Sequence, residues 1–260
     1  MNIQAKKLPK VSLVGAGPGD PELITLKAVK ALQSADAVLY DALVNEELLE
    51  YAPASAVRLF VGKRAGRHSY RQEEINKLIV EHAYHYGHVV RLKGGDPFIF
   101  GRGQEEMDYV KSFGIDVEVI PGISSSHAVP AINNIPLTAR GMSDSFWVIT
   151  GTTSGGKVSN DLYYAAQSNA TVIILMGMNK LKEIMGIFSR FQKDETPVAI
   201  IQNGSLPNQK MGIGTVSSIT SIAREKRLGS PAIIVIGEVV KVAQKEEFMA
   251  TILEQLEKKA

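Results

Sequence analysis

The residues best placed to bind a ligand lie in the run VVRLKGGDPFIFGRG, residues 89–103. Its first half alternates apolar and polar residues as a strand does, and Gly94, Gly95 and Asp96 follow at the strand's carboxyl end. Ligands bind at this end of the strands in open α/β sheets. The glycines allow close backbone approach, Asp96 offers acceptor oxygens, and residues 98–100 form an apolar wall. The spacing predicts a binding loop, although an ordinary strand–turn–helix joint has similar residues.

A second group of residues suited to ligand binding is cationic. Lys63, Arg64 and Arg67 crowd the segment after the third predicted strand, and Arg102 and Arg140 lie near other strand ends. Such groups bind carboxylates and phosphates, so the pattern predicts a cleft for a polyanionic small molecule. A solvated basic loop is the alternative interpretation. Nucleic acid is disfavoured because the net charge is only +2 and aromatic residues do not interleave with the cations.

The glycine-rich run VGAGPGD, residues 14–20, is similar to nucleotide-binding turns. It begins like G-x-G-x-x-G, and Asp41 follows the second predicted strand as a ribose-binding acid would. Pro18, however, lacks an amide hydrogen, and Asp20 places negative charge where a pyrophosphate would bind. A nicotinamide-dependent oxidoreductase therefore remains only an alternative hypothesis.

Two further motifs match other kinds of site incompletely. The run GTTSGGK, residues 151–157, has P-loop spacing, but Val158 stands where a magnesium-binding Ser or Thr is needed. His82, His85 and His88 could ligate a metal, yet no nearby acid or cysteine completes the set. Neither an ATPase nor a metal site is therefore expected.

Composition narrows the class of protein. The 260 residues are 45% hydrophobic and 22% charged, which is typical of globular proteins. There is no cysteine, which excludes disulfides and thiolate chemistry. The first ten residues lack the apolar segment of a signal peptide, and no apolar run reaches the ~20 residues of a membrane span. A cytoplasmic protein with no membrane partner is expected.

The elements that must position these residues form two α/β domains, residues 1–121 and 122–260, with mostly parallel or mixed sheets and an active-site cleft between them. In the first domain, strands are predicted at residues 11–15, 37–40, 59–61, 89–93 and 117–120, and helices at 21–34, 45–51, 72–86 and 104–113. In the second, strands are predicted at 146–150, 172–176, 198–202, 210–216 and 232–236, and helices at 161–167, 181–191, 219–226 and 246–258.

The ordered motifs carry a family resemblance that spans residues 11–240. They are VGAGPGDPELITLKA, YDALV, GKRAG, RLKGGDPFIFGRGQEE, PGISSS and IPLTARG, followed by MG, QNGS and GEVV. In this order the chain resembles the tetrapyrrole methylase family, the class III S-adenosylmethionine-dependent methyltransferases. The resemblance implies transfer of two methyl groups from S-adenosylmethionine to carbons C2 and C7 of uroporphyrinogen III, giving precorrin-2 for siroheme or cobalamin synthesis. Eight substrate carboxylates would then account for the cationic residues.

The resemblance also implies roles for individual residues. Asp41 matches the family's proposed proton acceptor and Lys63 its proposed donor, although Asp41 could cap a turn and Lys63 could simply bind carboxylate. Arg64, Arg67 and Arg102, with Arg140, are expected to bind substrate. The expected cofactor-binding residues are Pro18, Gly94, Gly95, Asp96, Ile99, Ser124, Ser125, Met176 and Gly204.

Two positions depart from the family pattern. Gln104 stands where close relatives usually have glycine, and Thr152 where many have histidine. The chain has no counterpart of the dehydrogenase–ferrochelatase module fused to some relatives, so we expect it to stop at methylation. A homodimer is expected because relatives are dimers. A later-step precorrin methyltransferase and a non-catalytic tetrapyrrole-binding protein remain alternatives.

Overall fold

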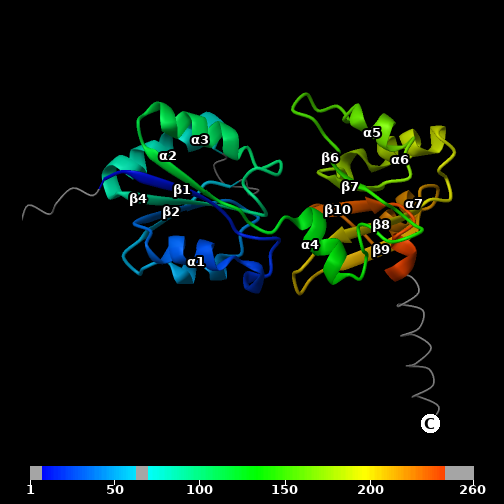
Figure 1. Cartoon of the computed structure of the whole chain (residues 1–260), viewed down its shortest axis with the longest axis horizontal. Coiled ribbons are helices and arrows are strands. Elements are labelled where there is room, and N and C mark those ends of the chain that lie inside the picture. Colours follow the sequence, from blue (N-terminus) through cyan, green and yellow to red (C-terminus); the bar gives the residue numbers. More distant parts are fainter. Residues whose placement is uncertain (1–7, 63–69, 244–260) are drawn as a thin grey trace, which may run out of the picture. The chain divides into compact units, whose positions relative to one another are not determined.

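The structure is a computed structural model that describes residues 8–62 and 70–243. Its chain divides into two compact units between Ser124 and Ser125 (Figure 1). The sequence predicts that division after residue 121, at the Pro121-Gly122 break. Every helix in the described ranges is too short or too polar to cross a membrane.

The first unit is built on a parallel sheet. Its strands are β1 (Lys10–Gly15), β2 (Ala37–Tyr40), β3 (Val57–Phe60), β4 (His88–Lys93) and β5 (Asp116–Ile120). Their order is β3-β2-β4-β1-β5, and every neighbouring pair is parallel. The helical segments are η1 (Pro21–Leu23), α1 (Leu26–Gln33), η2 (Glu46–Tyr51), α2 (Gln72–Tyr86) and α3 (Gly103–Ser112). All five strands therefore end at one edge, and the predicted α/β class is confirmed for this unit.

Helices cover both faces of this sheet (Figure 1). On one face, α1 and η2 pack against strand residues that include Val14, Val38 and Leu92. On the other face, α2 and α3 pack against a set that includes Leu13 and Leu39. Because the central strands are buried on both faces, they are nearly continuous apolar runs.

The second unit has a mixed sheet. Its strands are β6 (Phe146–Thr150), β7 (Thr171–Leu175), β8 (Pro197–Gln202), β9 (Lys210–Thr215) and β10 (Ala232–Ile236). Their order is β6-β7-β10-β8-β9; β6 and β7 are parallel, β10 is antiparallel to both neighbours, and β8 and β9 are antiparallel. Consequently β6, β7 and β8 end at the same edge. The helical segments are α4 (Ser125–Ile132), α5 (Asp161–Ala165), η3 (Met178–Lys180), α6 (Leu181–Arg190) and α7 (Ile219–Glu225).

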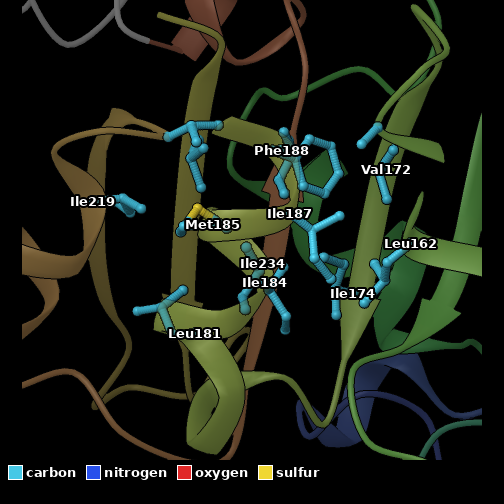
Figure 2. Packing of buried hydrophobic residues seen from close by; sticks show 14 of the residues in the cluster. Leu162, Val172, Ile174, Leu181, Ile184, Met185, Ile187, Phe188, Ile219 and Ile234 are labelled. Carbon is cyan, nitrogen blue, oxygen red and sulfur yellow. The ribbon is translucent and has the colours of Figure 1, made fainter. Parts of the chain in front are cut away.

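The larger core cluster of the second unit lies beneath α6. Figure 2 shows Ile184 and Phe188 from this helix among Ile174 of β7 and Ile234 of β10. The opposite sheet face packs against α4, where Val129 joins a second cluster. This packing fixes the strand ends, at which the predicted cofactor residues of this unit lie.

Most predicted elements are present, with three differences. The single helix predicted at residues 21–34 is wrong: a 3-10 turn capped by Asp20 ends at Leu23, and Thr25 then caps α1 by accepting a hydrogen bond from Ala28 N. The third strand begins and ends earlier than predicted. Helix α4 was not predicted, because a serine run and the internal Pro130 are more typical of loops. The predicted helix at 246–258 lies outside the described residues.

Candidate functional site

The carboxyl ends of β1 and β4 form the centre of the candidate site in the first unit. The connection after β1 runs on the α1 face and the connection after β4 on the α3 face, so these neighbours flank a topological switch point. Here two loops pair across the switch point, because Gly95 N donates to Gly17 O (2.7 Å) and Gly17 N donates to Gly95 O (3.2 Å). The loop after β1 and the GGD loop therefore form one continuous wall.

Glycine is required where this wall meets the end of β5. A Cβ on Gly15 would lie 2.5 Å from the Cα of Gly122, and a Cβ on Gly122 would lie 2.2 Å from the carbonyl oxygen of Gly95. Gly95 itself differs, because its φ is +67° and no atom lies within 4 Å of its Cβ position. The backbone is close-packed on one side of the wall and open at Gly95, which leaves room for a ligand beside the peptide groups.

Asp96 fixes the shape of the GGD loop. Its Oδ1 accepts a hydrogen bond from Phe98 N (2.8 Å), and its Oδ2 accepts one from Gly122 N (3.0 Å). The carboxylate thus joins the loop after β4 to the turn after β5. Beyond it, Phe98 and Ile99 are exposed, as the predicted apolar wall requires. Phe100 has a φ of +54°, a left-handed conformation that costs free energy in a bulky residue and marks a constrained loop.

Asp41 follows β2 at the same edge and is held from two sides. Arg91 Nη2 donates to its Oδ2 (3.2 Å), and Gly94 N lies 3.4 Å from its Oδ1. The side chain keeps 26% of its surface exposed, so a ligand can still reach the carboxylate. Neither of these hydrogen bonds comes from the turn that follows Asp41. They therefore differ from the turn-capping role, which was the alternative for this residue.

Behind Asp41 lies a buried ionic cluster that the sequence interpretation missed. Arg91 and Lys93 of β4 are nearly inaccessible, and both contact the fully buried Glu106 of α3. Arg91 Nε lies 3.1 Å from Glu106 Oε1, and Lys93 Nζ lies 2.9 Å from Glu106 Oε2. Gln72 of α2 also donates to Glu106 Oε1 (3.0 Å). With Asp41, the cluster contains two cations and two anions and is neutral overall.

The cluster determines the ionisation of its members. Burial raises the pKa of Glu106, but the charges of Arg91 and Lys93 outweigh it and hold that pKa below its ordinary value. Burial lowers the pKa of Lys93, the nearby Arg91 lowers it further, and Glu106 opposes part of the change. Glu106 is consequently a carboxylate at neutral pH, and Arg91 has a fixed anionic partner inside the protein.

In the second unit, Met176 lies at the carboxyl end of β7 in a left-handed conformation with a φ of +56°. Its carbonyl accepts a hydrogen bond from Thr152 Oγ1 (3.0 Å), and Gly151 N donates to Leu175 O (2.7 Å). A Cβ on Gly151 would lie 2.4 Å from the Cα of Gly177, so position 151 requires glycine. Thr152, one of the two departures from the family pattern, thus holds the Met176 backbone.

Gly204 lies just beyond β8 at the same edge of this sheet. Asn203 and Ser205 on either side have φ values of +51° and +70°. A Cβ on Gly204 would lie 2.3 Å from Val129 Cγ1, so the loop backbone packs directly on α4. A reciprocal amide pair fixes this arrangement: Gln209 Nε2 donates to Asn133 Oδ1 (2.8 Å), and Asn133 Nδ2 donates to Gln209 Oε1 (3.3 Å). Gln209 Oε1 also accepts from Ser205 N (3.1 Å).

The remaining predicted site residues differ in their surroundings, and some of them lie outside the described residues. Arg102, at the start of α3, forms a two-point ion pair with the exposed Glu105, at 2.6 and 2.8 Å. Arg140 is exposed in the loop before β6, and Pro18 is partly buried in the loop after β1. Ser124 and Ser125 lie at the division between the units. Lys63, Arg64 and Arg67 lie outside the described residues.

The structure gives physical reasons against the competing motifs. Gly17 donates its amide to Gly95 and is not available to a pyrophosphate. Residues 153–157 close a short loop in which Thr153 N donates to Lys157 O (2.8 Å), with no helix directly after it. His82 Nδ1 contacts Leu78 O within its own helix, and His88 contacts serines. Across residues 8–62 and 70–243, no group of three or more His, Asp or Glu side chains could hold a metal.

Comparison with known proteins agrees with this geometry. A family model described as tetrapyrrole (corrin/porphyrin) methylases matches residues 10–220. The chain is 48% identical, over 90% of its length and 97% of the relative's, to a uroporphyrinogen-III C-methyltransferase of Methanocaldococcus jannaschii. It is 46% identical to a siroheme synthase of Actinobacillus pleuropneumoniae over 90% of this chain, and spans about half (48%) of that longer relative.

A solved structure is also similar over nearly its whole length. The uroporphyrin-III C-methyl transferase from Thermus thermophilus, complexed with S-adenyl homocysteine, superposes with a TM-score of 0.77 and 38% identity. The match covers 90% of this chain and 99% of that one. The paired glycine loops, the two α/β units and these full-length matches lead to one conclusion: the chain belongs to the tetrapyrrole methylase family.

Proposed function

We propose that this chain is an S-adenosylmethionine-dependent C-methyltransferase that methylates uroporphyrinogen III at C2 and C7 to give precorrin-2. The observation that carries the proposal is the near-complete overlap with uroporphyrinogen-III C-methyltransferases, together with a family-model match whose range contains both loops at the β1–β4 switch point. The same loops argue against an oxidoreductase, because their amides are paired with each other.

The described residues fit a bound S-adenosylmethionine. Gly95 has free space at its Cβ position, and Met176 presents a left-handed backbone at a strand end. In this proposal Gly94, Gly95, Asp96, Ile99, Pro18, Ser124, Ser125, Met176 and Gly204 hold the cofactor, with Asp96 acting by shaping its loop. When bound, the cofactor supplies an electrophilic methyl group on a sulfonium.

The chain's own residues would then orient the macrocycle and manage its protons. Uroporphyrinogen III offers an electron-rich ring carbon, so alignment is the main task. Asp41 is the proposed proton acceptor, since it is partly exposed and lies at the same sheet edge as the GGD loop. Lys63 is the proposed proton donor. Arg64, Arg67, Arg102 and Arg140 are proposed to bind substrate carboxylates.

Incubation with uroporphyrinogen III and methyl-labelled S-adenosylmethionine tests the function. We expect two labelled methyl groups per macrocycle and an absorption spectrum of the oxidised dimethylated product. The same incubation is repeated with previously methylated precorrins. Label that enters these precorrins but not uroporphyrinogen III would instead identify a later-step methyltransferase. Macrocycle binding without label transfer to any of these substrates would refute an enzymatic role.

Asp41→Asn tests the proposed proton acceptor, because the amide keeps the shape of the carboxylate but cannot take up a proton. We expect kcat to fall about 10²-fold or more, while the Kd for the cofactor stays within about twofold. Asp116→Asn is the matched control, since Asp116 is exposed at the opposite edge of the same sheet. An unchanged kcat in Asp41→Asn would remove the proton-transfer role and leave the methyltransferase assignment standing.

We also propose that the protein acts as a cytoplasmic homodimer whose product feeds siroheme or cobalamin synthesis. Relatives named uroporphyrinogen-III C-methyltransferase and siroheme synthase support this place of the product. Light scattering during size-exclusion chromatography tests the dimer, and a mass of one chain at micromolar concentration would contradict it.

A further inference from the structure

The ionic cluster behind Asp41 is built around Glu106, which has 0% of its side chain exposed. It lies on α3 and cannot touch a ligand itself. Its Oε1 accepts from Arg91 Nε (3.1 Å), Lys93 Nζ (3.0 Å) and Gln72 Nε2 (3.0 Å). Any effect of Glu106 on a reaction at the sheet edge must therefore pass through one of these partners.

Arg91 is the partner that forms a hydrogen bond with Asp41. Its guanidinium is planar and rigid, so fixing one nitrogen fixes the directions of the others. Nε is bound to Glu106, and Nη1 donates to the carbonyl oxygens of Leu92 (3.0 Å) and Leu39 (3.4 Å). Nη2 is then directed at Asp41 Oδ2 (3.2 Å). One rigid group thus connects a buried carboxylate on α3 with a partly exposed carboxylate after β2.

We propose that Glu106 is a positioning residue: through Arg91 it fixes the carboxylate of Asp41 beside the GGD loop in the orientation that the methyl-transfer reaction requires. The proposal rests on the proposed function, because Asp41 acts on a substrate only there. It goes further because it adds to the site a buried residue of α3, which acts on Asp41 only through Arg91. The alternative is that Glu106 only neutralises two buried cations.

Glu118 provides a natural comparison. It also contacts two cations, Lys10 Nζ (3.1 Å) and Lys27 Nζ (2.7 Å), but its side chain is 34% exposed on β5. Water can replace these partners at the exposed Glu118, but it cannot reach the side chain of Glu106, which is fully buried. Glu118→Gln therefore removes a similar number of ion pairs without disturbing the proposed connection.

The decisive variant is the double substitution Glu106→Gln with Lys93→Met. It removes one anion and one cation together, so the cluster stays neutral with Arg91 and Asp41 as the remaining ion pair. Neutralisation is thus preserved while the charged anchor of Arg91 is lost. Full-length protein is assayed with uroporphyrinogen III and labelled cofactor beside wild type, Glu106→Gln alone and Glu118→Gln.

We expect the double variant to melt closer to wild type than Glu106→Gln does, yet to keep a kcat about 10²-fold below wild type. Its KM for the macrocycle and its Kd for the cofactor should change by less than about threefold, and Glu118→Gln should match wild type in kcat. Recovery of both melting temperature and kcat in the double variant would overturn the proposal and leave Glu106 a neutralising group.

Arg91→Lys decides the question should the double variant not fold. This substitution keeps all four charges, but a single ammonium cannot replace the fork that reaches Glu106 and Asp41 together. We expect a folded protein with a kcat at least tenfold lower, and a wild-type kcat would again overturn the proposal. An inactive wild type would instead refute the proposed function, so the two failures are distinguishable.

Discussion

The carboxyl edges of the two sheets are stabilised by different chemistry. In the first unit, Asp41 is backed by Arg91 and by the buried Glu106, all charged. In the second, the Gly204 loop is held by the neutral Asn133–Gln209 amide pair. The network of charges holds the Asp41 carboxylate in one orientation. A neutral edge suits the presentation of backbone groups to a ligand, because the amide pair that holds it adds no net charge.

The largest expected effect is on the free energy of unfolding. It is found by removing one member from the charged network and one from the neutral amide pair. Lys93→Met leaves Glu106 buried with one cation fewer and should lower the free energy of unfolding by about 3–5 kcal/mol. Asn133→Ala removes neutral hydrogen bonds and should cost about 1 kcal/mol. Urea unfolding followed by far-UV circular dichroism measures both, and the fluorescence of Trp147, the only tryptophan, reports on the second unit. Equal losses in the two variants would contradict the contrast between the edges.

A smaller effect on stability, but a specific one on binding, is expected at Gly95. Gly95→Ala meets no atom within 4 Å and should cost about 1 kcal/mol for its left-handed backbone, while the added methyl group enters the open side of the wall. The Kd for S-adenosylmethionine should rise about tenfold, as measured by calorimetry. Gly114→Ala is the matched control, since Gly114 has a φ of +71° and open space but follows α3, away from the carboxyl edge.

The corresponding change in the second unit should act through stability. An alanine at Gly204 would contact Val129 Cγ1 at 2.3 Å, so α4 or the loop must shift at a cost of about 1–3 kcal/mol. The difference between the edges is sharpened if Gly95→Ala melts no earlier than Gly114→Ala but binds the cofactor more weakly, while Gly204→Ala both melts earlier and binds it more weakly. Equal affinity losses in Gly95→Ala and Gly114→Ala would instead exclude Gly95 from the cofactor site.

The smallest expected effect lies at the opposite edge, at His88. Burial lowers the pKa of its imidazole, and Lys10 adds to this, against opposing contributions from the Ser34 carbonyl, Asp36 and Glu118. The unfolded chain therefore takes up a proton near pH 6.5, before the folded protein does, so stability is complete above that pH and falls as the pH drops further. The slope should not exceed about 1.4 kcal/mol per pH unit.

His88→Gln tests this pH dependence, because glutamine does not titrate. Between pH 7.5 and 5.5, urea unfolding should show a larger loss of stability for wild type than for the variant. Identical losses would mean that other groups dominate the acid response.

The sequence predicts where the helices and strands end better than it predicts the side-chain hydrogen bonds that hold the loops after them. Helix α2 has the predicted bounds, because apolar residues recur at helical spacing and Gly87 ends it with a φ of +112°. The GGD loop lies where predicted, yet both carboxylate oxygens of Asp96 accept backbone amides, which no motif reveals.

The ionic cluster was missed for a physical reason. Arg91 and Lys93 alternate with Val90 and Leu92, which is also the pattern of a strand with one solvated face. Only the strand order shows that β4 lies between β2 and β1 and is buried on both sides. Two cations at i and i+2 share one face of a strand, so a central strand with this pattern requires a buried acid nearby. Glu106 of α3 is the acid that meets this requirement in the structure.

The strand order of the first unit also bears on how the chain is made. β1 pairs only with β4 and β5, so Lys10 has no neighbouring strand until His88 has left the ribosome, and its second neighbour follows only with Asp116. In the second unit, β8 and β9 can pair as soon as the short turn between them is complete. Closing long loops is entropically costly and slow, so the apolar β1 segment must stay unpaired during much of its synthesis. The order of strands thus sets a period of exposure in which the nascent first unit depends on protection from aggregation.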